Sequence, residues 1–350
     1  HFEPYLNSAL KRFPILETTG IRKFFSGPES FTPDTNTLLG EVPEIKNFFV
    51  CCGLNSIGIG SGGGVGKATA EWMMTGHINE DIFNYDIKRF QNFHSKLDFI
   101  KSRITESLGD LYGMHWPFKQ HKTSRNIKTL PHHENLKSFG ACFGVSGGYE
   151  RPMWFALDGE KAEYEYSYNY QNWYPSAEYE TNNTVKNVGL FDLTPFSKFE
   201  IFSDKAHQEL QKLCTSNIKN EVGKCTYTHM LNTDGGIEAD LTVVCLDKNH
   251  FRIISSAATR ERDKFHIKKY LSKEIKLKDV TDDLCVFGLF GPKSRDLIKT
   301  ISNDDFENDN FKFGTSKFIT IEGVKIWAQR LSYVGELGYE LYVEFKDAKK

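Results

Sequence analysis

Apolar positions in the second half of the chain fall into short runs separated by polar turns. Each run has the length and the Val, Ile and Phe content of a β-strand. The predicted strands are FSKFEIF (196–202), ADLTVVCL (239–246), HFRIIS (250–255), CVFGLFG (285–291), KFITIEGVKIWAQRLSYVG (317–335) and ELYVEF (340–345). Helical spacing in DKAHQELQKLCT (204–215) and PKSRDLIKTI (292–301) predicts helices among them. The expected class is therefore α+β.

The first part of the chain has a different pattern. KNFFVCCG (46–53) predicts a buried strand, and KATAEWMMTG (67–76) predicts a helix that ends at Gly76. A glycine-rich turn is expected between them. Residues 81–130 are mixed and favour helix, which predicts a connecting subdomain. The chain is thus expected to divide into domains at 1–80, 81–130 and 131–350.

The glycine run resembles a nucleotide loop. Residues 58–63 fit G-x-G-x-x-G, and Gly66 with Lys67 resembles the end of a P-loop. A P-loop would need Gly at Ser61 and Ser or Thr at Ala68, and a dinucleotide-binding unit would need a second buried strand ending in an acidic residue. These requirements fail, so no phosphate is expected here. A helix N-terminus lined with glycine would still favour a flat, anionic ligand, and a purely structural tight turn is the alternative.

Composition narrows the classes of partner. The 350 residues carry a net charge of −2, and no apolar run approaches the roughly 20 residues of a membrane span. Neither nucleic acid nor a membrane span is expected. Alternating tyrosines at 164–170 predict one packed strand face. Seven Cys without C-x-x-C indicate reduced, mostly buried thiols. The pairs His115/His121 and His132/His133 lack the Cys or carboxylate company of a metal site, so no metal is expected.

Three stretches resemble one known family. GPESFTPD (27–34), GLNSIGIGSGGGVGKATAEWM (53–73) and YDIKRF (85–90) are similar to the last part of the flavin domain in the mitochondrial sarcosine and dimethylglycine dehydrogenase family. In that family this unit closes over the flavin ring rather than over its ADP part. The resemblance implies that FAD contacts four consecutive residues: Gly58, Ile59, Gly60 and Ser61.

Four later stretches resemble the aminomethyltransferase (glycine-cleavage T-protein) module fused to those dehydrogenases. They are NVGLFDLTPFSKFEI (187–201), TYTHMLNTDGGIEADLTV (226–243), LFGPKSRDLI (289–298) and RLSYVGELGYELYV (330–343). The resemblance implies a catalytic carboxylate, Asp240, beside the reactive nitrogens of tetrahydrofolate. It implies further folate contacts at Tyr227, Thr242, Glu336, Leu337 and Gly338. Free-standing aminomethyltransferases usually have an acidic residue where Ala239 stands, and the fused dehydrogenases share its replacement.

The resemblance implies FAD-dependent demethylation of sarcosine to glycine, with the one-carbon unit passing to tetrahydrofolate as 5,10-methylene-tetrahydrofolate. Electrons would leave through electron-transfer flavoprotein in the mitochondrial matrix. The chain is expected to be an internal fragment, inactive by itself. The dimethylglycine-oxidising branch is the enzymatic alternative. A regulatory subunit of pyruvate dehydrogenase phosphatase is the non-enzymatic one, although Glu336 and Glu340 favour a dehydrogenase.

Overall fold

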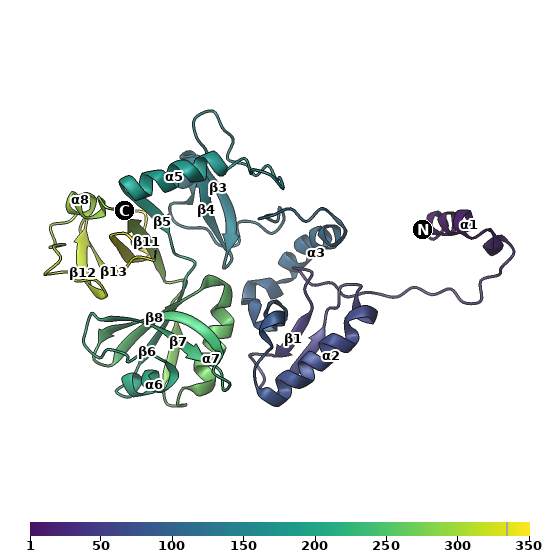
Figure 1. Ribbon diagram of the computed structural model, residues 1–350, viewed down its shortest axis with the longest axis horizontal. Helices are drawn as coiled ribbons and strands as arrows, with labels where there is room; N and C mark the ends of the chain where they lie inside the picture. The colour runs from purple at the N-terminus through teal and green to yellow at the C-terminus, as the bar shows by residue number, and fades with distance from the viewer. Residues whose placement is uncertain (334) are drawn as a thin grey trace. The chain divides into compact units, whose positions relative to one another are not determined.

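The computed structural model describes residues 1–333 and 335–350, which form two compact units, His1–Ser30 and Phe31–Lys350. The first unit holds helix α1 (Glu3–Arg12) and a 3-10 turn (Pro14–Glu17), and neither element has a buried residue. The second unit contains all strands of the described chain (Figure 1).

The second unit begins with a strand hairpin and a helix that lies along it (Figure 1). The elements are β1 (Leu38–Glu41), β2 (Phe49–Cys52), α2 (Gly58–Thr75), 3-10 turns at Glu80–Tyr85, Ile87–Arg89 and Asn92–Ser95, and α3 (Leu97–Tyr112). Trp72 of α2 packs with Leu39 and Ile78. Helix α2 ends at Gly76, whose φ is 82°, as the sequence predicted. Gly40, with φ of 108°, allows this packing, because a Cβ there would lie 2.2 Å from the Trp72 ring.

The strand predicted at 46–53 is confirmed as β2, but its predicted burial is wrong. Strand β2 is half-buried at Phe49 and Val50 and exposed at Cys51 and Cys52. It pairs only with β1 in a two-stranded sheet, and α2 contacts it from one side. The seven thiols are all free, but only Cys142, Cys245 and Cys285 are fully buried.

Two five-stranded antiparallel sheets and a hairpin form the rest of this unit. Their elements are α4 (His133–Ser138), β3 (Ala141–Ser146), β4 (Tyr149–Phe155), α5 (Tyr174–Lys186), β5 (Gly189–Asp192), β6 (Ser197–Phe202), α6 (Ala206–Leu213), β7 (Cys225–Leu231), β8 (Ile237–Asp247), β9 (His250–Ser255), α7 (Arg260–Tyr270), β10 (Lys276–Asp279), β11 (Leu284–Phe290), α8 (Ser294–Lys299), β12 (Thr315–Ile321), β13 (Val324–Arg330) and β14 (Gly338–Glu344). The sheet orders are β10-β6-β9-β8-β7 and β12-β13-β14-β11-β5. The α+β prediction is confirmed, and so are the predicted helices and strands from residue 196 onward, except that the run 317–335 forms two strands, β12 and β13, and its described residues after Arg330 are not strand.

The two sheets share one layer of buried side chains. On β8, Leu241, Val243 and Cys245 point into the core of the first sheet. Val244 points the other way and packs with Trp327 and other side chains of the second sheet. This end of β8 is therefore buried on both faces, which explains its nearly continuous apolar run.

The alternating tyrosines do not form a strand. Residues 161–173 have no regular secondary structure. The rings of Tyr164 and Tyr166 stack 5.7 Å apart, and both pack edge-on against Trp173, whereas Tyr168 and Tyr170 are exposed. Packing on Trp173 replaces the expected strand ladder.

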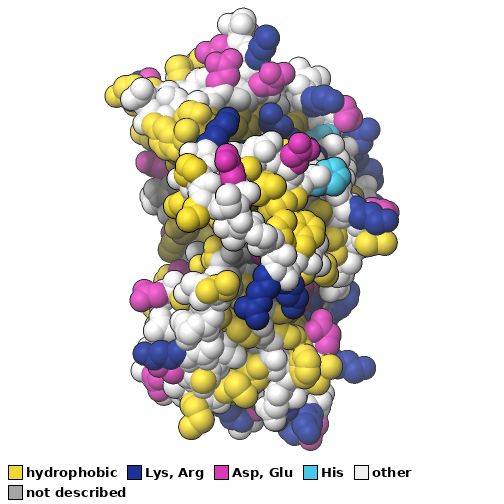
Figure 2. Space-filling view, turned by 90° about the vertical axis from the view of Figure 1, so that its right-hand side faces the viewer, with side chains coloured by type: hydrophobic (Ala, Val, Ile, Leu, Met, Phe, Trp, Pro, Cys, Tyr) yellow, Lys and Arg dark blue, Asp and Glu magenta, His cyan; other side chains and the backbone are white. Residues whose placement is uncertain are grey.

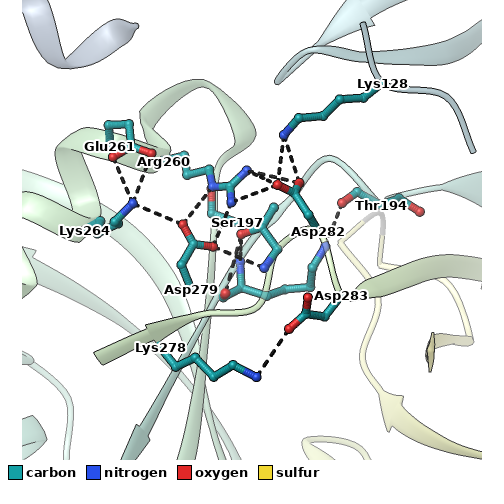
Figure 3. Close-up of polar contacts among 12 residues, drawn as sticks. Lys128, Thr194, Ser197, Arg260, Glu261, Lys264, Lys278, Asp279, Asp282 and Asp283 are labelled. Atoms are coloured by element: carbon teal, nitrogen blue, oxygen red, sulfur yellow. Dashed lines mark hydrogen bonds and ion pairs between the residues drawn. The ribbon is translucent and has the colours of Figure 1, made fainter. Parts of the chain in front are cut away.

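An ion-pair network ties the connecting segment to the sheets (Figure 3). Arg260 of α7 holds Asp279 through two bonds of 3.0 Å and also reaches Asp282 at 3.2 Å. Lys128 donates to Asp282 at 2.9 Å. Burial opposes ionisation of Asp282, but Lys128 and Arg260 outweigh it and lower its pKa to about 2.

The surface carries charges of both signs. On the face drawn in Figure 2, Lys and Arg side chains lie among Asp and Glu and alternate with hydrophobic groups. Among the described residues, no helix combines the length and the apolar character that a membrane crossing requires.

Candidate functional site

The glycine run begins helix α2 instead of preceding it. The turn after β2 covers residues 53–57, and Gly58 is already the first helical residue. The predicted FAD contacts Gly58, Ile59, Gly60 and Ser61 thus form the first turn of the helix. Glycine permits either conformation, so the run itself did not indicate where the helix starts.

This helix end is open. Ile57 precedes the helix without a side-chain hydrogen bond to its amides, and Ile59 is fully exposed. A Cβ added at Gly60 would meet no atom of the described residues within 4 Å. Uncapped amides and a bare glycine surface fit a flat ligand with a negative edge, such as the flavin ring that the resemblance implies.

Two of the motifs from the flavin-domain resemblance meet in space. Arg89 of YDIKRF donates to both carboxylate oxygens of Asp34 in GPESFTPD, at 2.6 and 3.0 Å. Asn55, only 1% exposed, accepts from the Thr32 amide at 2.8 Å and so fixes the turn before α2 to the same loop. Sequence reasoning identified neither contact, because the partners lie 55 and 23 positions apart.

Three predicted folate residues lie on one face of the β7–β8 pair. Tyr227 lies directly opposite Thr242 in the register. The Tyr227 hydroxyl donates to Asp240 Oδ2 at 3.0 Å, and this bond is the main cause that raises the pKa of Tyr227. Tyr227 and Asp240 are exposed and Thr242 is half-buried. The structure therefore brings these three side chains together on an accessible surface.

A β-bulge interrupts the register of β7 and β8 two residues before Asp240. Leu231 pairs with Ile237 and Met230 pairs with Ala239, so Glu238 is an extra residue in β8. Side chains alternate along a strand, and one inserted residue reverses the alternation beyond it. The bulge therefore changes the face of Ile237, whereas the pairs His229–Asp240 and Tyr227–Thr242 follow in regular register and share one face. Arg262 holds Glu238 at 2.7 Å.

A fourth side chain, His229, belongs to the same cluster. It lies directly opposite Asp240 in the register, and its Nε2 is 3.2 Å from the Tyr227 hydroxyl oxygen. Sequence reasoning passed over His229. The signal was its two-residue spacing from Tyr227 in TYTHML, which places both side chains on one face once the segment is known to be a strand.

The other predicted folate residues lie before and at the start of β14. Glu336, Leu337 and Gly338 line a cavity of about 370 Å³ together with Phe313 and Arg330. Asp240, Tyr227 and Thr242 lie outside its lining. Val334, in the same motif, lies outside the described residues.

Leu337 and Gly338 have clear structural tasks. The Leu337 carbonyl accepts from the Gly291 amide at 2.8 Å. A Cβ at Gly338 would lie 2.2 Å from the Phe290 ring. Glu336, which is half-buried, is therefore the member of this group that can offer a functional side chain to a ligand.

The prediction that His121 lacks the carboxylate company of a metal site is wrong. Glu106 and Asp110 on α3 place oxygens within 4.8 Å of its ring nitrogen. Burial lowers the pKa of His121. The carboxylates are engaged by the protein, because Asp110 pairs with Lys119 and Glu106 accepts two backbone amides.

Three family models match successive parts of the chain. The FAD dependent oxidoreductase model matches residues 1–72, the FAD dependent oxidoreductase central domain matches 75–129, and the GCVT N-terminal domain matches 132–350. A solved structure of glycine cleavage system aminomethyltransferase T from Bartonella henselae has a TM-score of 0.52 and 20% identity, covering 64% of this chain and 55% of that one. This likeness shows the fold of the folate-type module.

Three curated relatives match almost the whole chain. 4-Methylaminobutanoate oxidase (formaldehyde-forming) of Paenarthrobacter nicotinovorans is 37% identical, and human mitochondrial sarcosine dehydrogenase is 33% identical; each match covers 98% of this chain and 42% of the relative. The mitochondrial pyruvate dehydrogenase phosphatase regulatory subunit of Mus musculus is 33% identical over 99% of this chain and 40% of its own.

The chain thus spans less than half the length of these relatives. With a GCVT domain over more than half of its residues and FAD dependent oxidoreductase segments before it, the chain belongs to the family of sarcosine/dimethylglycine dehydrogenase-like FAD oxidoreductases with a GCVT folate-binding domain.

Proposed function

We propose that the protein containing this chain is an FAD-dependent oxidoreductase that demethylates an N-methyl amino acid and passes the one-carbon unit to tetrahydrofolate. One observation supports this most strongly: the register of β7 and β8 places Asp240 and Tyr227 on one accessible face of the GCVT module, where the two side chains are hydrogen-bonded. Sarcosine is the proposed substrate. The similarity to 4-methylaminobutanoate oxidase makes a longer N-methyl amino acid the second candidate.

The two halves of the chain have separate tasks in this proposal. FAD, when bound, supplies the acceptor for hydride from the methyl group. Gly58, Ile59, Gly60 and Ser61 would hold the ring with the positive end of α2 toward its negative edge. The loop that Asn55 and Asp34 anchor would keep this helix end in place.

In this proposal Asp240 accepts a proton during the folate step. A tetrahydrofolate nitrogen loses its proton as it captures the one-carbon unit, and a carboxylate at that position can accept it. The Tyr227 hydroxyl, bonded to Oδ2, orients the carboxylate and stabilises its charge. Glu336 is proposed to hold the pterin, whose amino and ring N–H groups suit a carboxylate acceptor.

Electron-transfer flavoprotein is the proposed electron acceptor, and the mitochondrial matrix is the proposed location. Sarcosine and dimethylglycine dehydrogenases among the relatives are mitochondrial. Dye reduction by the full-length protein with sarcosine, dimethylglycine and 4-methylaminobutanoate tests the substrate. Reduction with none of them would favour the regulatory alternative, which the phosphatase regulatory subunit represents.

Replacing Asp240 tests the folate step. Asp240→Ala in the full-length protein should leave flavin reduction nearly unchanged. A hydrogen bond to a charged group contributes about 1.5–3 kcal/mol, so methylene-tetrahydrofolate should fall about 10- to 100-fold while free formaldehyde rises. Both products are quantified with sarcosine and tetrahydrofolate present. An unchanged product ratio would remove Asp240 from the mechanism, and lost flavin reduction would assign it to the fold.

A further inference from the structure

The Tyr227 hydroxyl lies between two side chains that can bind protons, Asp240 and His229. Its hydroxyl oxygen lies 3.0 Å from Asp240 Oδ2 and 3.2 Å from His229 Nε2. The two rings meet edge-on, with centroids 5.2 Å apart. A tyrosine hydroxyl can donate one hydrogen bond and accept another at the same time. The three side chains therefore form a continuous hydrogen-bonded chain across β7 and β8.

Backbone contacts hold His229 in this position from both edges of β7. On one edge, His229 pairs with Asp240 of β8. On the other edge, its amide donates to the Thr215 hydroxyl at 3.3 Å, and its carbonyl accepts from the Thr215 amide at 3.0 Å. The imidazole is half-buried, so one side of the ring meets Tyr227 and part of it remains open to water.

We propose that His229 is a positioning residue for the folate step: it acts on Asp240 through the Tyr227 hydroxyl and gives the collected proton a route to water. This inference rests on the proposed one-carbon transfer. It adds a residue that neither the motifs nor the resemblance indicated.

Each proton that one group releases is taken up by the next group, from tetrahydrofolate to water. As the one-carbon unit is captured, a tetrahydrofolate N–H bond breaks and an O–H bond forms at Asp240 Oδ2. The Tyr227 hydroxyl, which donates to Asp240 in the resting site, then turns and gives its proton to His229 Nε2, while its oxygen takes up the proton from Asp240. The imidazolium then releases a proton to water, which restores all three groups. The route requires a neutral imidazole with a free Nε2, so it closes when His229 is protonated.

Among the described residues, few other titratable groups lie near the hydrogen-bonded side chains of Asp240, Tyr227 and His229. Tyr227 is on the strand of His229, and Asp240 is on β8, with Glu238 nearby but paired to Arg262. On the other edge of β7, the Cys214 thiol interacts with Thr228 on the core side, and burial raises its pKa to about 12. Tyr333 is near enough for its charge to raise the pKa of Tyr227.

The test compares four full-length proteins with bound flavin: wild type, His229→Gln, His229→Phe and the control His115→Gln, whose side chain is exposed. Each reacts with sarcosine and tetrahydrofolate from about pH 5.5 to 7.5, the range of histidine titration. The flavin reduction rate and the fraction of one-carbon units recovered as methylene-tetrahydrofolate are measured in the same samples. Any pH dependence of the folate itself is common to all four proteins.

The captured fraction should rise with pH in wild type and in the control. In both His229 variants it should be flatter and, near the upper end, about two- to tenfold lower, the effect of one hydrogen bond. Gln can donate to the Tyr227 oxygen and should retain more capture than Phe. Flavin reduction should be equal in all four proteins.

Several results would overturn the inference. His229→Gln with the control's pH profile would remove His229 from the step. Better capture with Phe than with Gln would mean that the ring only packs, and slower flavin reduction would mean that it supports the fold. If wild type yields no methylene-tetrahydrofolate at any pH, the proposed function fails and this inference fails with it.

Discussion

Arg260 offers a quantitative test of the ion-pair network that joins α7 to the sheet. It is 9% exposed and forms two bonds of 3.0 Å with Asp279. Arg260→Met would keep the length of the side chain and leave the Asp279 carboxylate without its main partner. Breaking a buried pair costs about 3–5 kcal/mol. Asp279 retains Lys264 at 3.3 Å and a Thr281 amide at 3.1 Å, so we expect the lower end, about 3 kcal/mol.

Asp282 adds little to this cost. Its side chain is 47% exposed and keeps Lys128, and exposed pairs contribute less than about 1 kcal/mol. The control is Lys264→Met on the same helix, which removes the secondary partner of Asp279 and should cost under about 1 kcal/mol. Urea unfolding followed by circular dichroism measures both variants.

The loss should depend on pH. Burial opposes ionisation of Asp279, but its bonds to Arg260 and Thr281 outweigh it and lower its pKa. In wild type this contribution is complete above the unfolded carboxyl pKa of about 4 and disappears as the pH falls through the folded value. Without Arg260 the pKa rises, so the penalty is largest near neutral pH and decreases on acidification. An equal loss at about pH 7 and about pH 3, which lies below the unfolded carboxyl pKa, or a loss no larger than that of Lys264→Met, would refute the reasoning.

Two further predictions concern α2. Gly60→Val should change the stability of this chain by less than about 0.5 kcal/mol, because the new side chain meets no described atom and valine is a better helix former than glycine; the full-length variant should lose flavin absorbance, and normal flavin content would make the glycine purely structural. His77 Nε2 lies 2.8 Å from Asp234, whose hydrogen bond raises the pKa of His77, so this contact stabilises fully below about pH 6.5 and weakens as the pH rises through the folded pKa. Hydrogen-exchange protection at the end of α2 should decrease over that range in wild type and not in Asp234→Asn; an identical pH response in both proteins would contradict the assignment.

Local patterns determined much of the fold. The apolar runs from residue 196 onward predicted β6, β8, β9 and the second-sheet strands β11, β12, β13 and β14, because side-chain alternation is visible in consecutive residues. Helical spacing and Gly76 fixed the end of α2. The family motifs supplied Asp240 and Tyr227, and the structure places these two in hydrogen-bond contact.

Other features were decided only by tertiary structure. The exposure of β2 follows from a sheet that has no third strand among the described residues. The carboxylates beside His121 come from α3, and Arg89 meets Asp34 across 55 positions. Such contacts depend on how the elements pack, and no local pattern records them.

The face of the β7–β8 pair that carries Tyr227, His229 and Asp240 shows most clearly what the sequence and the tertiary structure each determined. The sequence contained Asp240, Tyr227 and His229, but their common orientation depends on the register in which β7 pairs with β8. A slip of one residue in that register would move Asp240 to the opposite face of the sheet. The register between β7 and β8 is set by pairing over the whole hairpin, and this is why only the folded chain brings the three groups together.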